Sequence, residues 1–278
     1  MSRPSPWPAS LWLVGAGNMA GAMLSRWLDA GLDPARVTVI RASEAPFADG
    51  VRTVRSVPDG APEVLMLGIK PQMLDTVAPD YAGVRAGVLV SILAGVEEDA
   101  LARRFAADAI VRAMPNLPVR LGKGVVALDS ASADAAARAA VEALMAPLGL
   151  VEWVERTRFD AVTALAGCGP GFVYRFIDAL AAGGTALGLC ADQAQRLAVA
   201  TVEGAGALAA DAGLSPAALA DRVASPGGST RAGLDVLDRD DALRRLLAET
   251  LAASWHRNAE MAAAARWPLT PAPTPPDP

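Results

Sequence analysis

The sequence predicts an α/β domain built on a parallel sheet, followed by an all-helical domain. Short apolar runs alternate with helical patterns through the first half, as in a sheet wrapped by helices. The first of these runs ends in a glycine-rich turn, and from Phe159 onward alanine-rich helical patterns replace the strand signals. We therefore expect domains at 9–157 and 158–267. Residues 268–278 are expected to form a disordered tail, because they are too rich in proline to pack.

Short runs of aliphatic residues mark the expected strands. Each run is followed by polar or turn-forming residues, and helical patterns separate most of the runs, which favours parallel pairing. The runs are Leu11–Val14, Val37–Ile40, Val64–Leu67, Val88–Ile92, Ala109–Val111, Val125–Leu128 and Leu150–Val154.

The glycine-rich turn after the first run has the spacing of a dinucleotide-binding loop. Gly15 makes the tight turn, Gly17 lets the backbone approach a pyrophosphate, and the small Ala20 lets the next helix pack on the strand. Asn18 and Met19 complete this loop at the expected helix start. The position between a strand and a helix favours cofactor binding over a plain turn, so the first domain is predicted to be Rossmann-type.

The end of the second run indicates which nicotinamide cofactor is bound. An enzyme that uses the unphosphorylated cofactor usually places a carboxylate there, but this chain has Arg41 and Ser43. Both side chains can hydrogen-bond to a 2′-phosphate, so NADPH is expected, with NADH still possible. A change of register by one residue would bring Glu44 close instead. A separate alternative is that Arg41 is a solvated surface charge.

Further polar residues follow strands at the same expected edge of the sheet. Lys70 and Pro71 come directly after an apolar run, and Asn116 follows Met114 and Pro115. Ligands gather at the carboxyl ends of parallel strands, which favours cofactor or substrate contact over simple solvation of the edge.

A second candidate site precedes a helical stretch near the end of the chain. Pro226 presets φ, two glycines allow close backbone approach, and the helix that follows leaves unpaired N–H groups for an anion. An ordinary turn with Thr230 as a helix cap is the alternative. The residues expected to hold a substrate carboxylate are Ser225, Gly227, Gly228, Ser229 and Thr230.

The all-helical domain shows three expected features. The stripe of Phe172, Phe176 and Leu180 has helical spacing and follows Pro170, which suits a first helical position, so we expect the stripe to pack in the core. Residues 191–212 form a helix that ends at Gly213. Another helix covers 241–266.

Composition excludes several classes of function. The net charge of −5 over 278 residues, without a basic stripe, argues against nucleic-acid binding. Charged or polar residues interrupt the apolar helices, so no membrane span is expected, and the chain reads as cytoplasmic. Cys168 and Cys190 are expected to be buried thiols, and His256 to be a helix-surface residue. We expect no metal site.

Six motifs in one order give the sequence a resemblance to the pyrroline-5-carboxylate reductase family from Leu11 to about Met261. They are Gly15–Ala20, Lys70–Gln72, Ser91–Gly95, Arg112–Pro118, Thr163–Pro170 and Ser225–Gly233. The resemblance implies reduction of 1-pyrroline-5-carboxylate to proline by a nicotinamide cofactor, the last step of proline biosynthesis, and adds Ala94 and Gly95 to the cofactor site. It also implies a cytosolic homodimer, or a ring of dimers, that associates through the helical domain.

The chain departs from the family pattern beside the expected substrate pocket. Where relatives usually read Ser-Gly-Ser-Gly-Pro-Ala-Tyr, it has Ala166, Cys168, Gly171 and Phe172, which removes two hydroxyls and a phenol. A related cyclic imine acid, such as a six-membered homologue, or a catalytically silent NAD(P)-binding regulator therefore stays open. A hydroxyacid dehydrogenase is disfavoured, because no lysine follows Val125. Thr230 is our candidate for assisting protonation of the imine nitrogen.

Overall fold

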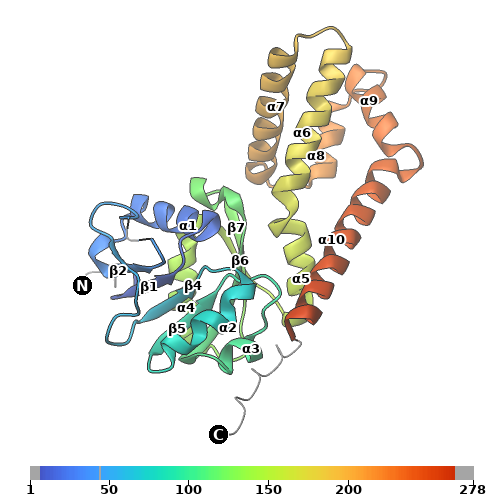
Figure 1. Ribbon diagram of the computed structural model, residues 1–278. Helices are drawn as coiled ribbons and strands as arrows, with labels where there is room; N and C mark the ends of the chain where they lie inside the picture. The colour runs from blue at the N-terminus through green and yellow to red at the C-terminus, as the bar shows by residue number, and fades with distance from the viewer. Residues whose placement is uncertain (1–6, 44, 267–278) are drawn as a thin grey trace, which may run out of the picture. The chain divides into compact units, whose positions relative to one another are not determined.

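The computed structural model describes residues 7–43 and 45–266 (Figure 1). These residues divide into two compact units, one reaching Gly167 and including the chain from Ser254 onward, the other spanning Cys168–Ala253. The expected tail, 268–278, lies outside the described residues. The domain bounds drawn from the sequence, 9–157 and 158–267, remain a prediction.

The first unit is built on an eight-stranded sheet with the order β3-β2-β1-β4-β5-β6-β7-β8. Every strand run expected from the sequence is present, and β3 is additional. The strands are β1 (Leu11–Val14), β2 (Val37–Ile40), β3 (Arg52–Val54), β4 (Val64–Leu67), β5 (Arg85–Ser91), β6 (Ala106–Pro115), β7 (Gly124–Asp129) and β8 (Gly149–Trp153).

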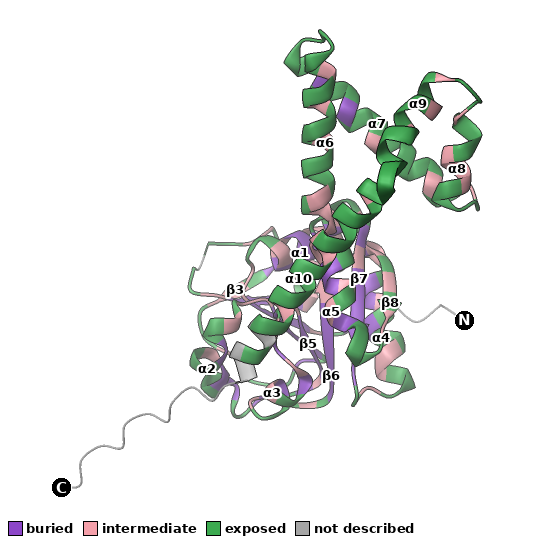
Figure 2. Ribbon diagram, turned by 90° about the vertical axis from the view of Figure 1, so that its right-hand side faces the viewer, coloured by how far each residue is buried: buried purple, intermediate pink, exposed green. Residues whose placement is uncertain are grey.

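Helices cover both faces of this sheet, which explains why its central strands are continuous apolar runs. Trp27 and Leu144 lie in the hydrophobic core on one face, and Tyr81 and Leu101 lie in the core on the other. Figure 2 shows the buried strands in purple. The helical segments are α1 (Asn18–Asp29), η1 (Pro34–Arg36), η2 (Pro71–Met73), α2 (Leu74–Val77), η3 (Ala78–Tyr81), α3 (Glu98–Ala102), η4 (Leu117–Leu121), α4 (Ala135–Met145) and η5 (Ala146–Leu148).

The sheet is not parallel throughout, which corrects the expectation from sequence. Strand β7 runs antiparallel to β6, with Arg112 opposite Asp129 and Pro115 opposite Val126, while β8 is parallel to β7. The physical reason is the connection, residues 116–123, which is too short for the helical crossover that a parallel pair needs. The chain consequently leaves β8 at the edge opposite to the one where β6 ends.

Residues 155–167 then return along β6. This segment contains η6 (Arg156–Arg158), α5 (Phe159–Val162) and the π-helical turn η7 (Thr163–Gly167). The guanidinium carbon of Arg112 on β6 lies 4.2 Å from the ring centroid of Phe159, and directly after β6 the Asn116 amide donates to the Ala166 carbonyl. The segment therefore reaches the carboxyl edge of the sheet just before the second unit begins.

Only helices follow β8 in the described chain. They are α6 (Gly169–Ala186), α7 (Ala191–Asp211), α8 (Pro216–Val223), α9 (Ser229–Asp238), η8 (Arg239–Asp241) and α10 (Ala242–Arg266). Gly213, with φ +61°, follows α7 as expected, and Pro170 is the second rather than the first residue of α6. No single described helix is long and apolar enough to cross a membrane, although α7 and α8, bent by 119°, satisfy the length and composition criteria as a pair.

The apolar stripe of α6 does not form a core within this chain, and that expectation is wrong. Phe176 is 50% exposed, Leu180 is 42% exposed, and Phe172 is half-buried. Much of α6 is green in Figure 2, in contrast to the purple strands. The sequence period identifies an apolar face but does not say whether this chain or another covers it.

Candidate functional site

The glycine turn after β1 has the geometry that its sequence predicts. Gly15 has φ +81°, a left-handed conformation that favours glycine, and its N–H donates to the Ile40 carbonyl at 2.8 Å. Gly17 is the N-cap of α1 and offers no side chain to cap it, and a Cβ built on Gly17 would meet nothing within 4 Å. The first N–H groups of α1, at Asn18 and Met19, therefore have no side-chain cap, and the backbone beside them at Gly17 is open, as an anion site requires.

The third position of the loop explains how α1 approaches the sheet. Ala20 is buried, and a Cβ built on Gly68, just after β4, would lie only 2.6 Å from the Ala20 Cβ. The same Cβ would lie 3.0 Å from the Gly15 carbonyl oxygen. The helix is thus close enough to the sheet that no side chain fits at Gly68.

Strand register brings the other candidate cofactor residues to the same edge. Val14, Leu67 and Ser91 are register partners on β1, β4 and β5, so the loops after these strands start side by side. Lys70 is exposed and precedes η2, whose first residue is Pro71. The loop after β5 contains Ala94, which is exposed, and Gly95, which has φ +74°.

Arg41 and Ser43 both bind the loop that follows β2. The Arg41 guanidinium donates to the Ala45 carbonyl, and the Ser43 hydroxyl accepts from the Ala45 N–H at 3.3 Å. The Arg41 Nε is buried without a hydrogen-bond partner among the described residues. Two polar side chains are thereby gathered at the strand end, while Glu44 lies outside the described residues.

Asn116 is buried at 6% exposure, and both its Oδ1 and its Nδ2 find partners inside the first unit. Its Oδ1 accepts from the Val125 N–H at 2.9 Å, and its Nδ2 donates to the Ala166 carbonyl at 2.9 Å. Its backbone N–H and carbonyl pair with Val125 and Val119. Asn116 therefore ties together the end of β6, the start of β7 and the turn η7.

The second unit carries the other candidate site on a turn before α9. The Gly228 N–H donates to the Ser225 carbonyl at 2.9 Å, and Gly227 has φ +70°, the combination of a type II turn with Pro226 at its first corner. Gly228 is then the N-cap of α9 and provides no side-chain cap. The N–H groups of Ser229 and the next two residues are consequently available to an anion.

Thr230 lies in the first turn of α9 and is exposed. Its hydroxyl takes part in none of the hydrogen bonds found among the described residues, so the structure does not support a capping role. The neighbouring Arg231 is held by Asp235 at 2.7 Å and by Asp238 at 3.0 Å, and these hydrogen bonds raise the pKa of its guanidinium. Arg231 is thus held mainly by its own helix, with Asp221 of α8 at 3.9 Å.

Comparison with known proteins identifies the family. A family model for pyrroline-5-carboxylate reductase dimerisation matches residues 156–261, and one for NADP oxidoreductase, coenzyme F420-dependent, matches residues 10–95. The pyrroline-5-carboxylate reductase of Synechocystis sp. is 35% identical over 263 residues, which cover 90% of this chain and 97% of that protein. The chain belongs to the pyrroline-5-carboxylate reductase family.

Other family members extend this agreement over the whole fold. The Thermus thermophilus reductase is 34% identical, and the match covers 90% of this chain and 98% of that one. The solved Coxiella burnetii pyrroline-5-carboxylate reductase is 27% identical, with a TM-score of 0.82 over 92% of this chain and 99% of that one. The Plasmodium falciparum pyrroline carboxylate reductase, solved with NADP bound, shares the fold at 22% identity, with a TM-score of 0.77 over 91% of this chain and 98% of that chain.

The departures from the family pattern lie where the first unit ends along the chain and the second begins, with Ala166 in η7 and Gly171 and Phe172 in α6. Cys168 is half-buried and Cys190 is exposed, so the expectation of two buried thiols is wrong.

His256 is exposed on α10, as expected. The described residues hold no group of three or more His, Cys, Asp or Glu side chains that could bind a metal ion.

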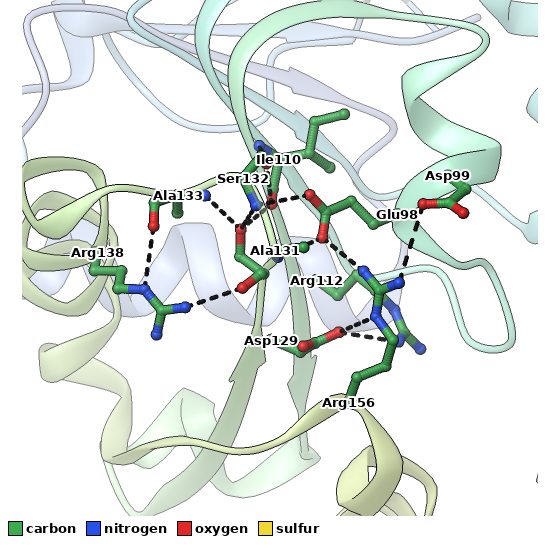
Figure 3. A network of polar contacts seen from close by, with 11 residues as sticks. Glu98, Asp99, Ile110, Arg112, Asp129, Ala131, Ser132, Ala133, Arg138 and Arg156 are labelled. Atoms are coloured by element: carbon green, nitrogen blue, oxygen red, sulfur yellow. Dashed lines mark hydrogen bonds and ion pairs between the residues drawn. The ribbon is translucent and has the colours of Figure 1, made fainter.

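Sequence reasoning missed a charged cluster at the other end of β7 (Figure 3). Arg112 and Asp129 form a buried ion pair at 3.2 Å. Arg156 pairs with Glu98 at 3.0 Å, and Glu98 also accepts from the Ala131 N–H at 2.7 Å. These side chains pair with one another, with the backbone and with Asp99, and Arg112 also lies over the Phe159 ring, so the cluster fastens the segment after β8 to the sheet. The sequence feature that could have predicted this cluster is Arg112, a charged residue within an apolar run.

Proposed function

We propose that this protein reduces 1-pyrroline-5-carboxylate to L-proline with NADPH as the hydride donor. The observation that carries the proposal is the match to pyrroline-5-carboxylate reductases of 34–35% identity over nearly their whole length. Net, the imine carbon gains a hydride and the ring nitrogen gains a proton, while NADPH becomes NADP⁺. NADH remains possible as an alternative donor.

The glycine turn and the edge of the sheet are suited to the cofactor. The open backbone at Gly17 and the uncapped start of α1 would hold the pyrophosphate. Arg41 and Ser43 would hold the 2′-phosphate, because both side chains already lie at the end of β2. When bound, the reduced nicotinamide supplies the hydride, and we assign its surroundings to Lys70, Pro71, Ala94 and Gly95, with Asn116 buried at the same edge of the sheet.

The turn before α9 is suited to the substrate. The type II turn at Ser225–Gly228 and the free N–H groups after it would bind the substrate carboxylate. We assign to Thr230 a hydrogen bond that supports the protonated ring nitrogen, because its hydroxyl has no partner among the described residues. A cyclic imine accepts hydride more readily when its nitrogen is protonated or hydrogen-bonded, so this bond would lower the barrier.

We further propose that the protein works as a cytoplasmic homodimer or a ring of dimers. Self-association is supported by the dimerisation family model and by the exposed stripe of α6, including Phe176 and Leu180. Two free cysteines are typical of a reducing compartment. Sedimentation equilibrium at nanomolar concentration tests the assembly, and a stable, active monomer would contradict it.

Kinetics on cyclic imines test the activity. The purified protein should oxidise NADPH when 1-pyrroline-5-carboxylate is added. A preference for the six-membered homologue would instead favour a related cyclic imine acid as the substrate, the alternative suggested by Cys168 and Gly171. Thr230→Ala should lower kcat/KM by roughly 10²–10⁴, the range for a positioned proton-transfer group, whereas Thr230→Ser should retain much of the rate. Absence of turnover with every imine would indicate a silent NAD(P)-binding regulator.

The melting temperature separates catalysis from stability at this position. Since α9 has no side-chain cap, Thr230→Ala should leave the melting temperature nearly unchanged. If Thr230 were a cap, the alanine variant would lose about 1 kcal/mol of stability and keep its turnover. That result would remove Thr230 from the catalytic machinery.

A further inference from the structure

Asn116 lies where three parts of the first unit meet. It follows β6 directly, precedes η4, and contacts η7 across 50 residues of sequence. Buried amides are nearly always satisfied, and here each end of the amide has one partner at 2.9 Å. These partners fix the orientation of the amide, because the Val125 N–H requires an oxygen and the Ala166 carbonyl requires an N–H.

The turn η7 is the element that depends most on this amide. A π-helical turn is a rare conformation, and such turns occur frequently at functional sites. Within η7, Leu165 is 63% exposed, whereas Thr163 is buried and its hydroxyl donates to the Phe159 carbonyl at 2.9 Å. The Ala166 carbonyl is bound from outside the helix by Asn116, next to the point where the chain enters the second unit.

We propose that Asn116 is a positioning residue that fixes the backbone of η7 at the carboxyl edge of the sheet, rather than a residue that contacts the ligands. This inference rests on the proposed function, in which hydride leaves a cofactor bound at that edge of the sheet. A hydride acceptor displaced by about 1 Å reacts far more slowly, while the cofactor itself can still bind. Asn116 therefore controls the rate of hydride transfer more than the affinity for NADPH.

The variant Asn116→Asp tests this separation. A carboxylate keeps the acceptor for the Val125 N–H but loses the donor to the Ala166 carbonyl and places negative charge beside it. We expect kcat to fall roughly 10- to 100-fold, while the Kd for NADPH changes less than about threefold. Amide hydrogen exchange at 163–168 should become about tenfold faster, with the strands unchanged.

The matched control is Ser130→Ala, at the other end of β7. Ser130 is also buried and its hydroxyl donates to the Ile110 carbonyl at 2.6 Å, whereas the hydroxyl's other hydrogen bonds go to Ser132 and Ala133 and not to η7. This variant should lose stability without altering kcat or the exchange at 163–168. If Asn116→Asp does not fold, Ala166→Gly replaces it, since it loosens the η7 backbone directly and should show the same pattern in milder form.

Two results would overturn the proposal. Unchanged hydrogen exchange at 163–168 in Asn116→Asp would show that the amide does not hold the turn. A loss of NADPH affinity as large as the loss of kcat would instead make Asn116 a cofactor contact. Failure of the wild-type protein to reduce any cyclic imine would refute the proposed function, whereas the exchange measurement would still decide whether Asn116 holds η7.

Discussion

Replacement of Gly68 by alanine should disturb both the fold and the cofactor site. The new methyl would lie 2.6 Å from the Ala20 Cβ and 3.0 Å from the Gly15 carbonyl oxygen. Carbon atoms in contact prefer about 3.5–4.0 Å, so α1 has to move by about 1 Å. Overpacking of this kind costs about 1–3 kcal/mol, partly offset by about 0.4–1 kcal/mol from the stiffer unfolded chain.

The displacement acts on the residues that we assign to the pyrophosphate. Because the new methyl would crowd both Gly15 and Ala20 of α1, we expect Gly68→Ala to bind NADPH about tenfold more weakly, a change of about 1.4 kcal/mol. Urea denaturation measures the loss of stability, and titration of the reduced-cofactor fluorescence measures the affinity.

A compensating substitution makes the test specific. Ala20→Gly removes the clashing methyl and should alone cost about 1 kcal/mol, the penalty for glycine within a helix. In the double variant the two losses should not add, and the coupling should be at least about 1 kcal/mol in the favourable direction. Additive losses, or a Gly68→Ala variant as stable as the wild type, would refute the packing argument.

Two further substitutions test separate features. Arg41→Ala should weaken NADPH binding by about 1.5–3 kcal/mol and leave NADH binding nearly unchanged, and equal losses in fluorescence titrations would show that Arg41 does not read the 2′-phosphate. Tyr81→Phe should keep or slightly raise stability at pH 7, because the buried Tyr81 hydroxyl has no partner among the described residues. Burial, with nearby Asp80, raises the pKa of Tyr81 above its usual 10.0, so wild-type stability should fall faster than that of Tyr81→Phe above pH 10, by up to about 1.4 kcal/mol per pH unit in urea titrations.

The parts of the fold that the sequence predicted are those in which one residue pattern has one physical outcome. The strands Leu11–Val14, Val37–Ile40 and Val64–Leu67 are buried on both faces, and their aliphatic runs predicted their bounds. Strand β3, Arg52–Val54, was not predicted, because a short, partly exposed edge strand needs no apolar run. The residues of β7 do not reveal whether the strand runs parallel or antiparallel to β6. The length of the connection, residues 116–123, does, because it is too short for a parallel crossover.

The candidate site shows the same division. The turn at Gly15 and the turn at Gly227 were predictable, because each needs a positive φ that glycine supplies. The partners of the Asn116 amide were not, because they belong to segments distant in sequence. The exposure of Phe176 was also beyond the sequence pattern, since helical spacing is the same whether the covering surface belongs to the same chain or to another.

The π-helical turn gives the helical unit an unusual sensitivity to chain length. From Phe159 to Ala186 the chain is almost continuously helical, and η7 closes its hydrogen bonds over five residues where an α-helix uses four. Loss of one codon within 163–167 could therefore regularise the turn into an α-helix and rotate every later residue of α6 by about 100°. The apolar stripe of α6 would then face another direction. A one-residue deletion in η7 would therefore change the orientation of the proposed dimer surface without changing any residue of that surface.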